Sequence, residues 1–526
     1  MPIKPVAGHS IARSTAVISS GTMLSRVTGL IRDMLIADYY LNAVSDAFFV
    51  AFRLPNMLRE MLAEGAMNAG FIPVFSEYMT RRSSKETEEL VAVSIGAMGA
   101  LLMAVSALGV LFAPEIVRFV TFEFGPPDEK LLLAIGLTRV VFPFILLVGI
   151  ASLLMAMLNS LQIFFSTAYA PVLLNLGMIA CAYLFRNNFK DPVYGLAVGV
   201  LIGGVLQILL QIPFIRRCGI PLRVAWNLKH PGLRMIFVLL VPTFFGQAVR
   251  EVNVLADTMF AWYLGEGMVS ALYYAYRLLH LPLAVFGLSV ATAILPSMSR
   301  SSSAGEMDKF KETLSLGLRT VMFTMLPATV GLIILRVPII RLLFEHGSFD
   351  ALATDNTAFA LMFYSLGLYA FSGAKVLAFA FYSMKNTRLP VIVAACSMIL
   401  NILLNALLMI PLKQGGLALA SSLSSTVNVV VLWIFLEKKV GDFGRRMIMA
   451  ATAKIAGLSL AMGACVYALA LICDHLVDPA TMAGKIVCVL IPLSGGVIFY
   501  MGLASAMQFD EASQIMRIWS ARRKKK

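Results

Sequence analysis

Long apolar stretches recur along the whole chain, separated by short polar segments; two of them are 90–113 and 193–215. About 20 consecutive apolar residues are enough for a helix to cross a bilayer. Strands of an outer-membrane barrel would instead show shorter, alternating segments. The pattern therefore predicts an all-α, polytopic membrane protein with about fourteen transmembrane helices. Their predicted positions are 11–38, 44–78, 88–113, 131–158, 168–186, 193–216, 233–263, 268–299, 312–335, 355–384, 388–410, 415–437, 446–473 and 484–507.

Composition and charge agree with this class. Hydrophobic residues make up 59% and charged residues 14% of the 526 residues, whereas soluble proteins carry about 25% charged residues. The net charge of +14 comes largely from basic clusters between alternate apolar stretches, at 81–85, 216–234, 300–311 and 438–446, and from the tail 521–526. The positive-inside rule then predicts that both termini are cytoplasmic. Because the basic residues are spread over helix ends, nucleic-acid binding is the weaker interpretation.

The chain also repeats itself. The segment SDAFFVAFRL at 45–54 aligns with VSALYYAYRL at 269–278, and the same offset of 224 pairs Arg26 with Arg250 and Asp33 with Asp257. The offset encloses six predicted spans, and an even number preserves direction. We therefore predict two parallel six-helix lobes, at 1–225 and 226–440, followed by two extra helices and a basic tail at 441–526. Two lobes around a central cavity are typical of transporters; a duplicated scaffold without transport function is the alternative.

Charged residues lie inside or beside the first, second, seventh and eighth spans. A charge near the bilayer centre costs roughly 2.5–3.5 kcal/mol, and such residues usually face a cavity on a substrate path. For Arg32 and Asp46, near span ends, snorkelling is an equally good interpretation. Pro55 is expected to break the second span near this charge. The full set is Arg26, Arg32, Asp33, Asp46, Arg53, Arg59, Glu60, Glu64, Arg250, Glu251, Asp257 and Arg277.

Arginine dominates this set, and guanidinium groups bind phosphate in a bidentate manner without losing their charge. The central cavity is therefore expected to bind an anion such as a phosphate or pyrophosphate. An exporter of cations would use exposed acids instead, and Asp33, Asp257 and Glu64 keep that alternative open.

Four segments resemble the MurJ/MviN family of lipid II flippases, in the multidrug/oligosaccharidyl-lipid/polysaccharide exporter superfamily. They are SRVTGLIRD (25–33), SDAFFVAFRLPNMLREMLAEGAMNAGFIPVFSEY (45–78), LYYAYRLLHLPLAVFGLSVATAILPSMS (272–299) and FYSMKNTRLP (381–390). The resemblance implies a transporter, not an enzyme, in the bacterial cytoplasmic membrane. Its substrate would be undecaprenyl-pyrophosphate carrying the peptidoglycan disaccharide-pentapeptide, moved to the outer leaflet by alternating access. Membrane lipids and the cell-wall synthesis machinery would be further partners.

The resemblance also implies a binding site. The family's cavity arginines correspond to Arg26, Arg32, Arg59 and Arg277, and its supporting residues to Asp33, Asp46, Arg53 and Glu64. We include Arg53 and Arg250 among the substrate-binding candidates and Asn56 among the supporting ones. Helices at 446–473 and 484–507 would hold the polyprenyl tail. The chain departs from the family pattern at Tyr276, beside Arg277, and at His280.

The energy source is less clearly indicated. No GxxxxGK[ST] sequence occurs, which argues against ATP as the driver, and no cofactor or metal site is predicted. Asn401 and Asn405 share a helix face and, with Asp257, could bind Na⁺ or H⁺; hydrogen bonding between packed helices is the preferred alternative. The membrane potential is another candidate source. Other functions in view are a cation-coupled small-molecule exporter, a flippase of another polyprenyl-linked glycan, and a membrane enzyme, which would need an acidic metal-binding motif.

Overall fold

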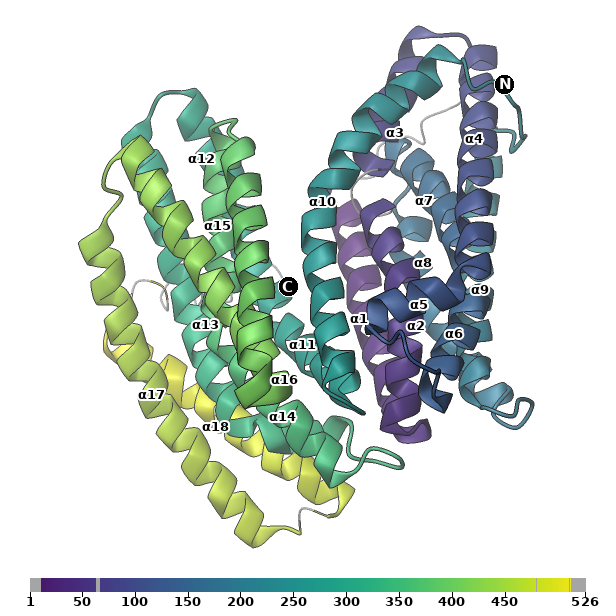
Figure 1. Ribbon diagram of the computed structural model, residues 1–526. Helices are drawn as coiled ribbons and strands as arrows, with labels where there is room; N and C mark the ends of the chain where they lie inside the picture. Colours follow the sequence, from purple (N-terminus) through teal and green to yellow (C-terminus); the bar gives the residue numbers. More distant parts are fainter. Residues whose placement is uncertain (1–10, 63–66, 479, 510, 512–526) are drawn as a thin grey trace. The chain divides into compact units, whose positions relative to one another are not determined.

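The computed structural model describes residues 11–62, 67–478, 480–509 and 511, and these residues form helices and no strands (Figure 1). They belong to two compact units, which divide between residues 269 and 270. The first unit holds α1 (Ile11–Tyr39), α2 (Asn42–Met61), α3 (Met67–Arg81), α4 (Ser84–Leu111), α5 (Ala113–Thr121), α6 (Glu129–Val141), α7 (Phe144–Ser160), α8 (Phe165–Leu184), α9 (Val193–Arg217) and α10 (Pro231–Tyr263).

The second unit contains nearly all of α11 (Met268–Pro282), which a short π-helix, η2 (Leu283–Gly287), joins to α12 (Leu288–Ser303). It continues with α13 (Met307–Leu343), α14 (Ala351–Leu366), α15 (Leu368–Ser383), α16 (Arg388–Val440), α17 (Arg445–Leu476) and α18 (Met482–Ala506). The lobe boundaries predicted after residues 225 and 440 stay a prediction.

The all-α membrane fold is confirmed, but the count of fourteen spans is not. Within the described residues, ten helices are long and apolar enough to cross a membrane, or eleven if α14 and α15, bent by 41°, form one span. Helices α1, α2 and α3 are not among the ten. The two spans predicted at 388–410 and 415–437 count once, because α16 runs through both, with a non-helical residue at Lys413 (φ 45°).

The helix break predicted at Pro55 is wrong. Helix α2 continues through Pro55 and ends at Met61. A proline removes one backbone donor, and helices in membrane proteins tolerate the loss where neighbouring groups satisfy the freed carbonyl. The charged side chains before and after Pro55 therefore lie on one continuous helix. The described chain resumes with α3 at Met67.

Helix α8 packs against both α1 and α9 in the first unit. Glycines set the distance between α8 and α9: a Cβ added to Gly177 would lie 2.8 Å from the Cα of Gly203, and one added to Gly199 would lie 2.7 Å from the Cα of Met178. Small residues allow such close backbone approach between membrane helices. This close packing on α9 fixes how α8 is rotated about its axis, and therefore which of its side chains face α1.

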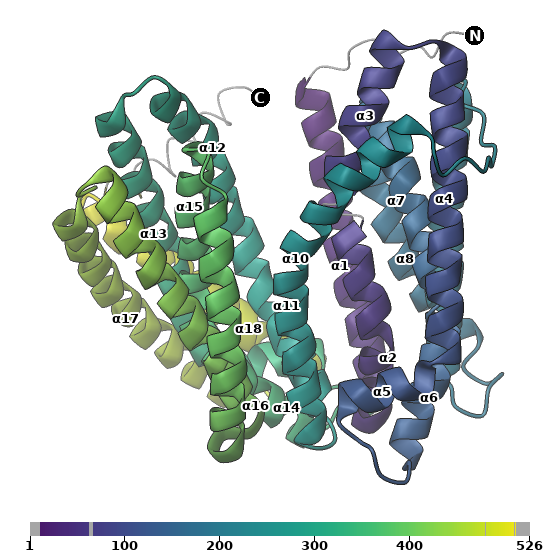
Figure 2. The same cartoon turned by 45° about the horizontal axis from the view of Figure 1, so that its top comes forward.

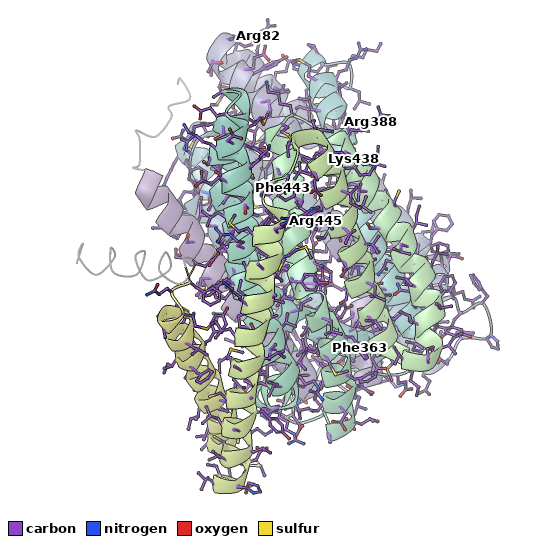
Figure 3. The ribbon with its side chains drawn as sticks, turned by 90° about the vertical axis from the view of Figure 1, so that its left-hand side faces the viewer. Arg82, Phe363, Arg388, Lys438, Phe443 and Arg445 are labelled. Atoms are coloured by element: carbon purple, nitrogen blue, oxygen red, sulfur yellow. The ribbon has the colours of Figure 1, made fainter. Side chains whose placement is uncertain are left out.

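Helix α13 packs against α12, α14, α15, α17 and α18 in the second unit, and Figure 2 shows α17 next to α13. Tyr500 of α18 donates a hydrogen bond to the carbonyl of Phe323 in α13 at 2.8 Å. Between α16 and α17, Phe443 lies against Trp433 with ring centroids 4.6 Å apart. Figure 3 shows Phe443 beside Lys438 and Arg445 at this junction.

Candidate functional site

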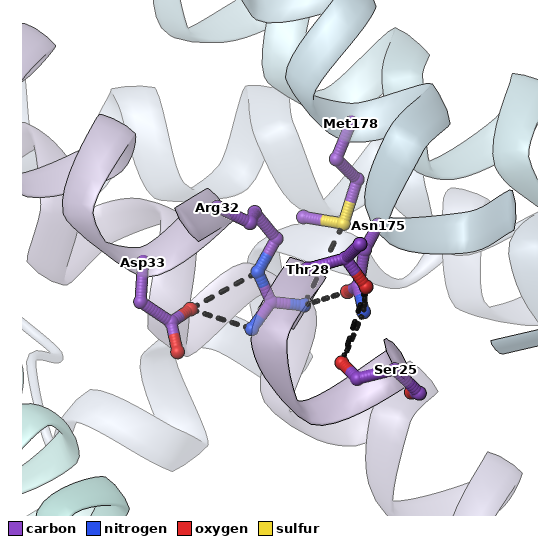
Figure 4. Close-up of polar contacts among 6 residues, drawn as sticks. All are labelled: Ser25, Thr28, Arg32, Asp33, Asn175 and Met178. Carbon is purple, nitrogen blue, oxygen red and sulfur yellow. Dashed lines mark hydrogen bonds and ion pairs between the residues drawn. The ribbon is translucent and has the colours of Figure 1, made fainter. Parts of the chain in front are cut away.

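A buried polar network joins α1 to α8 (Figure 4). Arg32 donates from Nε and Nη2 to Asp33 Oδ1 at 3.0 and 2.6 Å, and from Nη1 to Asn175 Oδ1 at 3.1 Å. Asn175 in turn donates to the carbonyl of Ser25 and to Thr28 Oγ1. Arg32 is only 7% exposed and Asp33 is fully buried. Arg32 therefore does not snorkel towards water; it forms part of the contact between two helices.

Arg26, which is also on α1, lies in a different setting from Arg32. Arg26 is exposed and forms no ion pair with any described residue. Seven positions along the same helix, Asp33 is fully buried. A spacing of seven residues places Arg26 and Asp33 on the same side of a helix, yet only Arg26 is accessible to a ligand.

Asp46 lies near the start of α2 and ties this helix to α6 and to the loop that follows α10. Its Oδ2 accepts hydrogen bonds from Lys130 Nζ at 3.0 Å and from the backbone N–H of Gly267 at 2.7 Å. The Lys130 ammonium lies 4.0 Å from the centroid of the Trp262 ring, and Trp262 Nε1 donates to Glu123. Because Asp46 is fully buried, these partners, not water, stabilise its charge, and they fix α2 against the start of α6 and the loop between α10 and α11.

Helix α2 carries two more of the predicted arginines, Arg53 and Arg59. Arg53 reaches across to α10, where its Nη2 lies 3.4 Å from Oε2 of Glu251, a residue that is only 2% exposed. Arg59 belongs to a local group: its Nε donates to Asn56 Oδ1 at 2.9 Å, and its Nη2 lies 3.4 Å from Glu60 Oε1. Asn56 also donates to Glu60 at 3.0 Å. The Arg59 and Glu60 side chains are 22% and 25% exposed, so this group is partly accessible.

Three further charged candidates are Arg277, Arg250 and Glu64. Arg277 is half-buried on α11. Tyr276 and His280, where the chain departs from the family pattern, pack on each other with ring centroids 4.3 Å apart. Glu64 and the side chain of Arg250 lie outside the part of the chain that the structure describes.

The two asparagines of α16 take part in helix packing. Asn401 Nδ2 donates to Ser421 Oγ at 3.1 Å, and Asn405 Nδ2 donates to Asn401 Oδ1 at 3.1 Å. Ser421 lies beyond the break at Lys413, so the bonds join the two halves of α16. This is the hydrogen-bonding role that the sequence favoured. Asp257, in the first unit, is buried on α10, and its participation in an ion site with these asparagines stays a prediction.

Sequence reasoning missed two partners, Asn175 and Lys130. Asn175 is an amide in the middle of the apolar stretch 168–186, which was the signal available for it. Lys130 stands just before the stretch 131–158 in a loop that carries few basic residues. Neither position reveals that it faces Arg32 or Asp46, because the contacts join residues 143 and 84 positions apart.

Known proteins resemble this chain over most of its length. The family model described as lipid II flippase MurJ matches residues 40–486. A probable lipid II flippase MurJ of Vibrio cholerae is 37% identical over 431 residues, which are 80% of this chain and 82% of the relative. A lipid II flippase MurJ of Burkholderia cenocepacia is 33% identical over 435 residues, covering 82% and 84%.

Solved structures agree in fold. A structure described as lipid II flippase MurJ in an inward closed conformation has a TM-score of 0.79 and 27% identity, over 94% of this chain and 99% of that one. An inward-facing multidrug resistance transporter of the MATE family and MOP superfamily has a TM-score of 0.67 and 16% identity, over 83% and 99%, and so shares the fold alone. The chain is therefore a multi-pass membrane protein that belongs to the lipid II flippase MurJ family.

Proposed function

We propose that the chain flips lipid II from the inner to the outer leaflet of the bacterial cytoplasmic membrane by alternating access. The observation that carries this proposal is the partly exposed Arg59 group on α2, in a chain of this family. A guanidinium held by neighbouring acceptors is pre-organised to form two parallel hydrogen bonds with a phosphate. Arg26, exposed on α1 without an ion pair among the described residues, supplies a second guanidinium that a phosphate can reach.

The buried pairs have a different role in this proposal. Arg32, paired with Asp33 and bonded to Asn175, joins α1 to α8, and Asp46 with Lys130 joins α2 to α6. These contacts hold the helices in register and keep the binding arginines in place. Arg53, Arg250 and Arg277 complete the candidate set. The positions of the basic loops support cytoplasmic termini, and transport is coupled to Na⁺, H⁺ or the membrane potential without a bound cofactor.

Complementation tests the proposal directly. The native flippase is depleted in a bacterium, the chain or a variant is supplied, and lipid II is measured in each leaflet. We expect the intact chain to restore lipid II in the outer leaflet. The Arg26→Ala and Arg59→Ala variants should reach the membrane but fail to restore lipid II in the outer leaflet. Arg216→Ala removes an exposed arginine in the last turn of α9, and this variant should restore it.

Two outcomes would contradict the proposal. Rescue by both Arg26→Ala and Arg59→Ala would show that neither guanidinium is needed for the anionic headgroup. Failure of the intact chain, despite its insertion in the membrane, would indicate a different polyprenyl-linked glycan or a small-molecule substrate. Replacing lipid II with those substrates in the same assay separates the two.

A further inference from the structure

A lateral groove lies on the first unit between α4 and the α6–α7 pair. It has a volume of about 590 Å³ and is lined by Met103, Ala107 and Leu111 of α4 and by Leu146 of α7. Met103 and Leu111 are 59% and 69% exposed, so the groove opens onto the outer surface of the helices. Figure 1 shows α4 beside α7. A groove at the surface of a membrane helix pair faces the bilayer, and its volume lies in the range of about 300–1,000 Å³ that holds a ligand.

Two polar groups interrupt this apolar surface. Arg139 of α6 lines the groove, is exposed, and forms no ion pair within the described part of the chain. Ser106 of α4 also lines it; this side chain is 6% exposed, and its Oγ has no hydrogen-bond partner among the described residues. Buried hydroxyl groups are normally hydrogen-bonded, so an unpartnered one calls for a missing partner.

The position of Arg139 along the helix fits a lipid headgroup. One turn earlier, Gly136 approaches the hydroxyl of Tyr194, which lies in the first turn of α9. Tyrosine is enriched where helices leave the hydrocarbon for the headgroup region. Arg139 is therefore near the level of lipid phosphates, while Leu146, two turns further along the helical pair, is at the level of acyl chains.

We infer that this groove binds an anionic phospholipid of the surrounding bilayer. The phosphate would pair with the Arg139 guanidinium, one acyl chain would lie along Met103, Ala107 and Leu146, and a glycerol or ester oxygen would accept a hydrogen bond from Ser106. Charge complementarity favours an anionic headgroup, and the lateral opening favours a lipid that enters from the bilayer. This site is separate from the buried charge pairs, and its existence does not depend on lipid II being the substrate.

Native mass spectrometry of the full-length protein, titrated with phosphatidylglycerol or phosphatidylcholine, tests the site. We expect phosphatidylglycerol to bind in preference to phosphatidylcholine. Arg139→Gln should weaken phosphatidylglycerol binding about tenfold, as expected for a lost charged hydrogen bond, and should abolish the preference. Arg216→Gln, which removes an exposed arginine outside the groove, should leave the preference unchanged.

A steric pair of variants provides the second readout. Ala107→Trp fills the groove, whereas Ala104→Trp adds the same side chain at an exposed position of α4 that does not line it. Both alanines are exposed, so both variants should fold. We expect only Ala107→Trp to lower phosphatidylglycerol occupancy. Equal occupancy in the two variants, or an unchanged lipid preference in Arg139→Gln, would overturn the inference. Displacement of phosphatidylglycerol by undecaprenyl phosphate at equal concentration would also overturn it, in favour of the substrate lipid as the occupant.

Discussion

Removing the carboxylate of Asp33 should strongly destabilise the first unit. In the wild-type chain Arg32 Nη2 lies 2.6 Å from Asp33 Oδ1, with side chains 8% and 0% exposed. At this distance, and with an effective dielectric constant of about 20, the attraction is roughly 6 kcal/mol. The desolvation of the Asp33 carboxylate, which Asp33→Ala relieves, offsets part of that loss. Breaking a buried pair by removing one partner typically costs about 3–5 kcal/mol, because the other charge stays buried.

The assay is thermal unfolding of the purified protein in detergent. Asp33→Ala should lower the midpoint on the order of 10 °C. Arg32→Met should do the same, because it leaves a buried carboxylate. The double variant Arg32→Met/Asp33→Leu replaces the pair with apolar contacts and should cost less than either single change. Because Asn175 loses its Arg32 donor in that variant, a residual cost of about 1–3 kcal/mol is expected.

A double-mutant cycle measures the coupling between the two residues. We expect a coupling free energy of several kcal/mol, since each single substitution breaks the same ion pair between Arg32 and Asp33. If each single substitution costs less than about 1 kcal/mol and the two costs are additive in the double variant, the claim that Arg32 and Asp33 form a strongly coupled buried pair is refuted. The matched control is the exposed pair of Arg82 and Glu86, 3.6 Å apart, for which the same cycle should give about 0–1 kcal/mol.

Three further outcomes follow from particular contacts. Arg59→Lys should reduce flipping about 10–100-fold. Two nitrogens of the Arg59 guanidinium donate to two different residues, and a single lysine ammonium cannot reproduce both hydrogen bonds. Arg53→Lys, with one contact to replace, should be milder in the same complementation assay; equal losses would contradict this ranking. Gly149→Leu should lower the free energy of unfolding by about 1–3 kcal/mol, because an added side chain meets Leu102 of α4. An unchanged unfolding midpoint would contradict that packing. Two backbone N–H groups at the start of α17 lower the pKa of Asp442, so its contribution to stability is present above the ordinary carboxyl pKa and lost as pH falls through the lowered one. Asp442→Ala should therefore flatten the acid limb of the unfolding profile, and an unaltered limb would show that Asp442 contributes nothing.

Most helices could be located from sequence because the bilayer imposes a simple length requirement on apolar stretches. The details inside those stretches could not. The helix is interrupted between α6 and α7 at Phe142 and Pro143, and the chain forms the π-helix η2 without a change in hydrophobicity. It also stays helical through Pro55, where local propensity predicts a break. In each case tertiary packing decides the backbone, and apolar composition carries no record of that packing.

The charged site, like the helices, could be predicted only in part from the sequence. An arginine or aspartate inside an apolar stretch is conspicuous, so Arg32, Asp33 and Asp46 could all be found. Their partners could not, because Asn175 and Lys130 are brought close by the packing of distant helices. The sequence therefore indicated which residues carry charge, and the structure adds which charges are already neutralised.

That neutralisation decides which arginines can recognise an anion. A phosphate that binds Arg32 or Arg53 must displace Asp33 or Glu251, which are 0% and 2% exposed. The displaced carboxylate would stay buried and lose that arginine's charge, and breaking a buried pair typically costs about 3–5 kcal/mol. Around Arg59 the competing acid, Glu60, is 25% exposed and can turn to water, so the same exchange costs about 1 kcal/mol or less. Anion recognition should therefore fall to Arg59 and the exposed Arg26, while Arg32 and Arg53 hold the helices that position them.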